Sequence, residues 1–304
     1  MTTLEAIRDE LAQVTAGPSD EVPIARAALL IAQSEYPDLD IDLYEHRLQS
    51  IAERLEEEIR EVGNVGNTRS PRQIPLTVNR LLYRELGFRG NDAAYEDPRN
   101  LYLNYVLDER TGIPVTMALV YSEICQRAGI DVRPVGLPGH VICRYQPSWS
   151  DEPADSVLLD VFNAGRVLSE RDCQVLVKNT FGSTQQFHEH YLATLTPRQL
   201  LQRVLHNLKV AYVRRGDEDR AARIIELKLT LFPWDLDEIR DRGMLRERLG
   251  DYALAIEDLE HYVVFRPGAR DVQTVRETLR SLRLHRASSS ADDAEQPNHQ
   301  DLPN

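Results

Sequence analysis

The sequence predicts an α+β protein whose C-terminal third is all helix, and two observations point to this fold class. The first is a change of hydrophobic period: a helical pattern over residues 114–128 is followed by strand-like segments over 130–135, 140–145 and 157–161. A helix followed by consecutive strands, rather than strands alternating with helices, is typical of α+β folds. The second observation is a set of residues that recurs at constant spacing after residue 200.

The N-terminal residues have helical patterns, and one segment is almost continuously apolar. Residues 25–32 (ARAALLIA) predict a helix that is buried on most sides. A stretch rich in Gly, Asn and Pro over 61–75 predicts a loop. We therefore take 1–75 as an N-terminal helical region and 76–195 as the core domain.

The helix of the core domain is expected to begin at Pro114. Proline is favoured at the first helical position because the N–H that it lacks would be unpaired there in any case. Gly129 then marks the end of the helix. A bend at 136–139 and a polar turn at 146–155 separate the strand-like segments that follow. This part of the chain therefore predicts one helix and a small sheet.

The C-terminal part repeats. Three residues recur 34 positions later: Gly216 as Gly250, Ala221 as Ala255, and Pro233 as Pro267. This period, with small residues where helices approach closely, resembles the tetratricopeptide repeat. The resemblance implies paired helices over 196–285 and a protein or peptide as the partner. Residues 286–304 are polar and acidic, so we expect a disordered tail.

Composition places the chain among ordinary globular proteins. Of its 304 residues, 42% are hydrophobic and 28% charged, and 36 Lys and Arg against 49 Asp and Glu leave a net charge of −13. This charge disfavours nucleic acid and an anionic membrane surface as partners, because phosphate binds to local positive charge. We find neither a bilayer-spanning apolar segment nor a secretory leader, so we expect a cytoplasmic protein. The sequence does not indicate its oligomeric state.

The cysteines and the absence of phosphate-binding motifs indicate which bonds and cofactors we do not expect in this chain. There are three cysteines, Cys125, Cys143 and Cys173, with no CxxC pair, which suits a reducing compartment without disulfides or a zinc ribbon. The chain has neither GxGxxG nor GxxxxGK[ST], so we predict no nucleotide cofactor. His188 and His190 are the best metal candidates, but no further ligand cluster accompanies them, so we predict no metal.

Three features follow one another between residues 98 and 162. They are a helix opened by Gly112-Ile113-Pro114, a histidine that starts a strand (His140), and an aspartate that ends the next strand (Asp160). This order resembles the transglutaminase-like, papain-type core. In that fold a cysteine opens the helix, a histidine takes its proton, and an aspartate orients the histidine. The resemblance implies a helix-plus-antiparallel-sheet core with His140 and Asp160 as a catalytic pair.

The cysteine of that pattern is missing at the expected position. Alignment on Ala118 and Gly129 places the nucleophile at Pro114, which has no nucleophilic group. Thr116 is the neighbouring hydroxyl, but a helix dipole does not ionise a hydroxyl as it does a thiol. Cys125 lies eleven residues further along the helix, about 16 Å from its start at about 1.5 Å per residue.

A closer resemblance covers most of residues 20–285. The blocks that carry it are Asp97-Pro98-Arg99-Asn100, Gly112-Ile113-Pro114, Gly136-Leu137-Pro138-Gly139-His140, Asn207-Leu208-Lys209 and Arg240-Asp241-Arg242-Gly243. They resemble the bacterial SirB1-like family, which joins a transglutaminase-like domain to tetratricopeptide-like repeats. Three further residues are candidates to line the same cleft and bind a ligand: Tyr102, Asn104 and Arg110.

Two hypotheses of function follow. The first is a degenerate transglutaminase-like protein that serves as a protein-interaction or regulatory module, because Pro114 replaces the nucleophile. The second is a hydrolase or acyl-transferase in which His140 is the base, Asp160 orients it, and water or Thr116 attacks. A structural role for His140, bonded to backbone and to Asp160, is the simpler interpretation of the pair.

Overall fold

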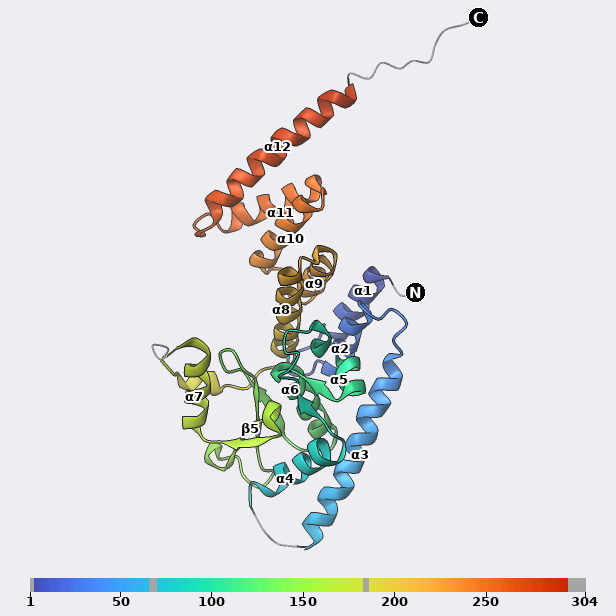
Figure 1. Ribbon diagram of the computed structural model, residues 1–304, viewed down its shortest axis with the longest axis vertical. Coiled ribbons are helices and arrows are strands. Elements are labelled where there is room, and N and C mark those ends of the chain that lie inside the picture. The colour runs from blue at the N-terminus through green and yellow to red at the C-terminus, as the bar shows by residue number, and fades with distance from the viewer. Residues whose placement is uncertain (1–2, 66–69, 183–185, 295–304) are drawn as a thin grey trace, which may run out of the picture. The chain divides into compact units, whose positions relative to one another are not determined.

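The computed structural model describes residues 3–65, 70–182 and 186–294, and its contacts divide the chain into two compact units (Figure 1). Unit 1 comprises Met1–Arg215 and unit 2 comprises Gly216–Asn304. Unit 1 combines helices with a small antiparallel sheet, and the described part of unit 2 is helical. The predicted α+β class is confirmed.

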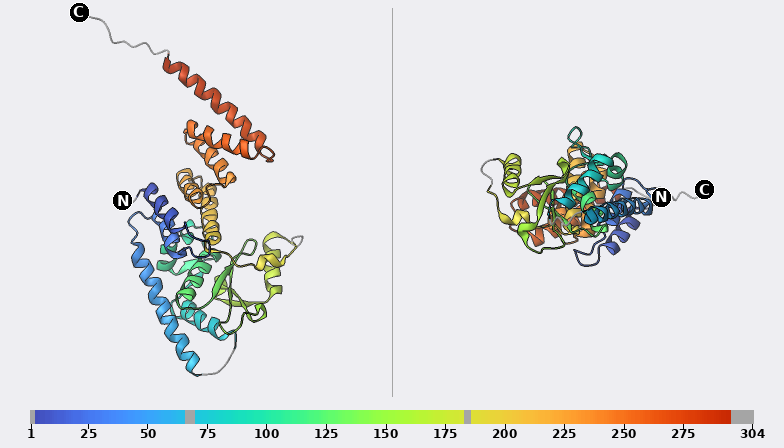
Figure 2. Two further views of the ribbon diagram at one scale, coloured as in Figure 1. Left: turned by 180° about the vertical axis from the view of Figure 1, so that it is seen from behind. Right: turned by 90° about the horizontal axis from the view of Figure 1, so that it is seen from below.

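The N-terminal part of unit 1 is helical, and helices also cover 61–65 and 73–75, where the sequence predicted a loop. Its helices are α1 (Leu4–Val14), α2 (Ile24–Gln33), α3 (Ile41–Val65) and α4 (Gln73–Asn79), and α4 continues into the π-helix η1 (Arg80–Glu85). Eight of the ten residues of α2 are buried, which confirms the apolar pattern of 25–32. The long helix α3 runs along the outside of the unit (Figure 2).

The core domain is built on α6 (Pro114–Arg127), with Pro114 at its first position. Every residue from Pro114 to Cys125 is buried, and Gly129 at φ +73° ends the helix. Only glycine adopts this backbone conformation without steric cost. The helix therefore begins and ends where the sequence predicts, but it is surrounded by protein on all sides.

The sheet has four antiparallel strands in the order β3-β4-β5-β6. Their bounds are β3 (Val132–Val135), β4 (Ile142–Tyr145), β5 (Val157–Asp160) and β6 (Arg166–Leu168). The first three are the strands expected from the sequence, whereas β6 was not predicted. A short parallel pair joins β1 (Arg89–Gly90) to β2 (Thr111–Gly112), and β2 comes just before α6 in the chain. These elements are joined by α5 (Leu103–Glu109) and short 3-10 turns η2 (Pro98–Leu101), η3 (Pro153–Asp155) and η4 (Val161–Asn163).

Unit 1 ends with helices that follow the sheet. They are α7 (Glu170–Phe181), the 3-10 turn η5 (Glu189–Leu192) and α8 (Pro197–Arg215). The helix α8 packs against α2, α6 and η2, and the hydroxyls of Tyr212 and Tyr102 are 2.8 Å apart. From the sequence we expected the helical repeats to begin at residue 196, ahead of α8. The contacts instead group α8 with unit 1, which ends at Arg215.

Unit 2 contains α9 (Glu218–Leu231), α10 (Leu236–Arg248), α11 (Tyr252–Phe265) and α12 (Val272–Ala294). The matched glycines precede α9 and α11 with positive φ, and the matched alanines Ala221 and Ala255 are fully buried. The repeat therefore corresponds to equivalent positions in two successive helix pairs. Helix α12 extends past residue 286 into the segment predicted as disordered, and residues 295–304 lie outside the described residues.

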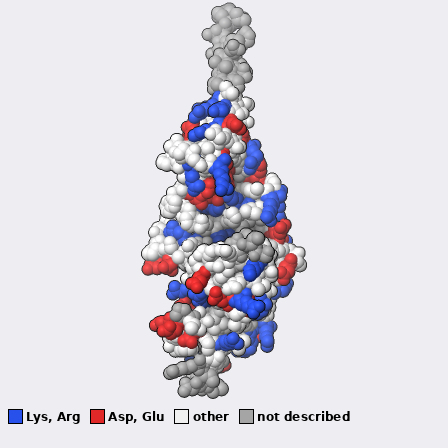
Figure 3. All heavy atoms as spheres, turned by 90° about the vertical axis from the view of Figure 1, so that its left-hand side faces the viewer, with Lys and Arg blue, Asp and Glu red and all other residues white. Residues whose placement is uncertain are grey.

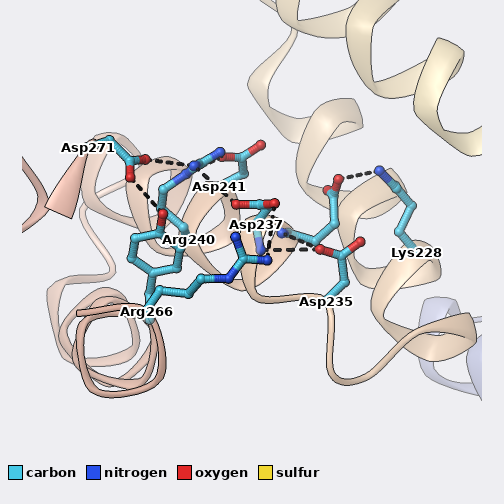
Figure 4. Close-up of polar contacts among 9 residues, drawn as sticks. Lys228, Asp235, Asp237, Arg240, Asp241, Arg266 and Asp271 are labelled. Atoms are coloured by element: carbon cyan, nitrogen blue, oxygen red, sulfur yellow. Dashed lines mark hydrogen bonds and ion pairs between the residues drawn. The ribbon is translucent and has the colours of Figure 1, made fainter. Parts of the chain in front are cut away.

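Polar contacts join the helices of unit 2 (Figure 4). Arg240 of α10 pairs with Asp271 at 2.7 Å, and Tyr262 of α11 donates to the other oxygen of Asp271 at 2.7 Å. Lys228 of α9 pairs with Glu238 of α10, and both side chains are buried. Removal of one partner from the buried Lys228–Glu238 pair would leave the other charge unpaired in the interior, so this pair favours the observed packing of α9 on α10.

Gly243 tests the close packing of α10 on α11. A Cβ at this position would lie 2.8 Å from Leu259 Cγ and 3.0 Å from Asp258 Cβ. We expect Gly243→Ala to lower the free energy of unfolding of unit 2 by about 1–2 kcal/mol despite the better helix propensity of alanine. Gly268→Ala is the control, because nothing lies within 4 Å of its Cβ position. Equal denaturant midpoints for the two variants would contradict this packing argument.

Candidate functional site

The structure brings His140 and Asp160 together. His140 lies in the bend before β4, Asp160 ends β5, and the distance from His140 Nε2 to Asp160 Oδ1 is 3.0 Å. Asp160 is fully buried, and the His140 side chain is 13% exposed. The imidazole thus has one nitrogen held by a carboxylate at the edge of the protein interior.

A second donor supports the carboxylate. Asn163, in the turn after β5, donates from Nδ2 to Asp160 Oδ2 at 2.8 Å, and Arg166 lies 3.8 Å from the same oxygen. Burial alone would raise the pKa of Asp160, but the hydrogen bonds from His140 and Asn163 outweigh it and hold the pKa below its ordinary value. Asp160 is therefore ionised at neutral pH.

An aromatic side chain covers the imidazole. The rings of His140 and Phe162 meet edge to face with centroids 6.3 Å apart, and Tyr95 meets Phe162 in the same way at 6.0 Å. Gly90 of β1 leaves room for Phe162, since a Cβ there would lie 2.6 Å from the Phe162 carbonyl oxygen. The β1–β2 pair thus positions the ring that packs on His140.

Arg203 of α8 fixes the loop that carries His140. Its guanidinium donates to the carbonyls of Gly136 at 3.1 Å and Leu137 at 3.2 Å, and the His140 carbonyl is 3.5 Å away. A Cβ on Gly136 would lie 2.7 Å from Arg203 Nη2, so glycine is needed for this approach. Burial lowers the pKa of Arg203. Sequence analysis missed Arg203, Asn163 and Phe162, because neither motif nor spacing links them to His140.

The first turn of α6 is occupied by backbone contacts. Thr116 donates its hydroxyl to the Asn100 carbonyl at 2.7 Å and accepts the Ile113 N–H at 3.2 Å, and its side chain is 1% exposed. A Cβ on Gly112 would lie 2.8 Å from Thr116 Oγ1, which explains the glycine of the Gly112-Ile113-Pro114 motif. Pro114 itself is buried. The Thr116 hydroxyl thus serves to cap the helix.

The three cysteines are buried in the core of unit 1. Burial raises the pKa of Cys125 and Cys143 well above the ordinary range, and it raises the pKa of Cys173 to about 11. The thiolate is the reactive form of cysteine, so at neutral pH all three thiols are protonated and poorly nucleophilic.

The three candidate ligand-binding residues are mostly engaged within the protein. Tyr102 is buried, with its hydroxyl against Tyr212, and Arg110, at φ 55°, donates to the Leu86 carbonyl. Asn104 is buried, and its Oδ1 has no hydrogen-bond partner among the described residues. Tyr102 and Arg110 thus take part in a side-chain and a backbone contact, respectively.

His188 and His190, the candidates for which the sequence predicted no metal, face each other. The rings of His188 and His190 are stacked with centroids 5.3 Å apart, because the chain enters a 3-10 turn here rather than an α-helix. In the described part of the chain, no three His, Cys, Asp or Glu side chains are grouped to hold a metal ion.

Positive and negative side chains are interspersed on the face drawn in Figure 3.

Comparison with known proteins agrees with this architecture. Residues 42–206 match the family model of the transglutaminase-like superfamily, and residues 208–280 match a tetratricopeptide repeat. A UPF0162 protein of Xylella fastidiosa (strain Temecula1) is 35% identical over 265 residues, which cover 84% of this chain and 89% of the relative. The chain therefore belongs to the UPF0162 family, and the family expected from its sequence is confirmed.

More distant relatives include bacterial and animal proteins. A UPF0162 protein of Vibrio cholerae is 30% identical over 184 residues, or 60% of this chain and 66% of the relative. Human F-box only protein 21 is 28% identical over 163 residues, or 53% of this chain and 25% of that protein.

In the described residues, we find no helix with the length and apolar character needed to traverse a bilayer.

The lowered pKa of Asp160 predicts a specific pH dependence of stability. Since the folded pKa lies below 3.8, ionised Asp160 stabilises the fold above that pH, and its contribution is lost as the pH falls through 3.8 toward the folded pKa. We expect Asp160→Asn to cost about 1–3 kcal/mol near neutral pH, and this difference from the wild type to shrink toward about pH 3. Denaturant unfolding at a series of pH values measures it, with exposed Asp20→Asn as control. A difference that does not change with pH would contradict the assignment.

Proposed function

We propose that this chain is a non-catalytic transglutaminase-like protein that acts in the cytoplasm as a protein-interaction module. The observation that carries the proposal is the first turn of α6. Pro114 stands where the resemblance places the nucleophile, and the only hydroxyl beside it, Thr116, donates to the Asn100 carbonyl. Without a group to activate, the base and its orienting carboxylate cannot start acyl transfer by the usual route.

The cysteines support the same conclusion. All three are fully buried, and burial raises their pKa, so a thiolate would have to form in an apolar environment. His140 and Asp160 then have a structural role. Their hydrogen bond, with Arg203 on the loop carbonyls, holds the bend before β4 against the end of β5.

Unit 2 supports an interaction role. Several large apolar side chains are exposed there, among them Trp234 (71%), Val264 (68%) and Phe265 (62%). Val264 and Phe265 lie on one face of α11 with Leu254 and His261, at helical spacing. Exposed apolar surface of this kind is typical of protein contacts, and tetratricopeptide repeats offer such faces.

One observation favours a second candidate function, a hydrolase that uses water. Asp160 holds Nε2 of His140, and among the described residues nothing hydrogen-bonds to Nδ1, which is free to accept a proton. In this mechanism His140 would take a proton from a water molecule as the water oxygen attacks an acyl carbon. The bond to the leaving alcohol or amine would then break, and the imidazolium would give the proton to that group. The two candidates differ in one measurable respect, namely whether turnover depends on His140.

An activity panel separates these candidates. We expect the wild type and His140→Ala to hydrolyse ester, amide and peptide substrates at the same rate as buffer, while His140→Ala loses about 1–2 kcal/mol of stability with its buried hydrogen bond. Exposed His46→Ala is the control for removal of an imidazole. Turnover by the wild type that disappears in His140→Ala and has a bell-shaped pH profile would establish the hydrolase instead.

The exposed face of α11 tests the interaction role. We expect the full chain with Val264→Asp and Phe265→Asp to lose specific partner cross-links in cells, because charge on an apolar contact face opposes its burial. Glu257→Gln, on the same helix, changes a side chain that is already polar and serves as control. Quantitative mass spectrometry of cross-linked peptides measures the loss, and unchanged cross-links in the double variant would contradict a role for this face.

A further inference from the structure

A cavity of about 660 Å³ lies in unit 1 between α4–η1 and the turn into β6. The helical side is lined by Pro75, Leu76 and Tyr83, and the strand side by Ala164, Arg166 and Val167. This volume is within the range of about 300–1,000 Å³ that is usual for ligand sites in proteins. Neither His140 nor Asp160 lines it, so it is distinct from the pair described above.

The two walls of the cavity are fastened to each other. Asn79 donates to the Gly165 carbonyl at 2.8 Å, and Tyr83 donates to the Val161 carbonyl at 2.7 Å. Gly165 has a φ of +68°, and a Cβ there would lie 1.9 Å from Asn79 Oδ1. Because the hydrogen bonds and this close approach hold the walls in place, the cavity exists before a ligand binds, which reduces the entropic cost of binding.

The charges at the cavity have one sign. Arg80, Arg84 and Arg166 line it, and among the described residues no carboxylate does, although the whole chain has a net charge of −13. Arg80 is already paired with Glu58 and Glu85.

The other two arginines have fewer ion-pair partners than Arg80 among the described residues. Arg84 is exposed and has no hydrogen bond or ion pair within the described part of the chain. Arg166 is 57% exposed, and its nearest carboxylate, Asp160, is 3.8 Å away and already accepts from Asn163. Arg84 and Arg166 can therefore pair with carboxylates of a ligand.

The cavity also borders a free sheet edge. At the opposite edge of the sheet, β3 is covered, since Val135 bridges to Thr194 and the Leu195 N–H donates to the Pro134 carbonyl at 2.7 Å. On its outer side, β6 pairs with no strand of the described residues. Such an edge offers backbone N–H and C=O groups to an extended peptide.

We propose that this cavity binds an extended acidic segment of a partner protein. The segment adds alongside β6, places one apolar side chain between Leu76 and Val167, and pairs flanking carboxylates with Arg84 and Arg166. Leu76 favours a peptide over a small anion, because it is 62% exposed at the rim and only a longer ligand would cover it. The proposal rests on the interaction role proposed above, to which it adds a site and a partner chemistry.

The test measures binding of acidic peptides to the full chain. A fluorescent library of ten-residue peptides, each with one Leu, Ile or Phe among Asp and Glu, is titrated by anisotropy. We expect salt-sensitive binding that weakens at least tenfold in Arg84→Glu with Arg166→Glu. Arg171→Glu is the matched control, an exposed arginine of the same unit that does not line the cavity, and its affinity should stay within twofold of the wild type. Thermal unfolding confirms that each variant is folded.

Two further arms distinguish the mode of binding. Methylation of the peptide backbone nitrogens should abolish binding if the segment adds to β6, and octanoate, a small amphiphilic anion, should compete weakly. The proposal is overturned if no peptide binds below about 1 mM, if the arginine variants bind equally well, if methylated peptides bind unchanged, or if octanoate binds where no peptide does. The Val264→Asp, Phe265→Asp variant should keep full peptide affinity, so failure here remains distinguishable from failure of the α11 contact.

Discussion

The buried carboxylate of Asp160 is the constraint on which much of unit 1 depends. An ionised group without water must find donors within the protein, and here His140 and Asn163 provide them. These two contacts bring the bend before β4 and the turn after β5 to one point. The Gly165 N–H donates to the backbone carbonyl of Asp160 at 2.9 Å, so the same residue also anchors the turn into β6.

Consequences of this anchor extend to both sides of the sheet. On one side, Arg203 of α8 binds the carbonyls of the loop before His140, which makes α8 part of the domain that it follows. On the other side, Gly165 accepts from Asn79 and so aligns α4 and η1 with β6. The turn after Asp160 therefore also forms one wall of the cavity beside β6.

Unit 2 is organised by a different rule. Its helices are joined by charged side chains with low exposure, such as Arg242 and Arg246, which both contact Asp258 of α11 and Glu226 of α9. Asp258 is buried and pairs with both arginines, so an alignment that removed them would leave its carboxylate without these partners. The interaction role is proposed for the exposed face of α11, which carries the apolar side chains of Val264 and Phe265.

The local elements and their order follow from the amino-acid sequence. Pro114 and Gly129 bound α6 because their backbone preferences act within a few residues, and the recurrence of Gly216 as Gly250 marks equivalent turns for the same reason. It also brought His140 and Asp160 into consideration as a pair, through a pattern shared with a known family. These features can be predicted from the sequence because each depends on near neighbours or on a fixed spacing.

The distant residues that support these elements become evident from the three-dimensional contacts. Arg203, Asn79 and Phe162 have no motif, and their roles arise from contacts between segments far apart in the chain. The short strand β6 was missed because three residues give too little pattern to identify, and its pairing with β5 makes it a strand. The Thr116 hydroxyl is likewise a cap rather than an exposed group because the Asn100 carbonyl comes within 2.7 Å, a contact that spacing alone does not reveal.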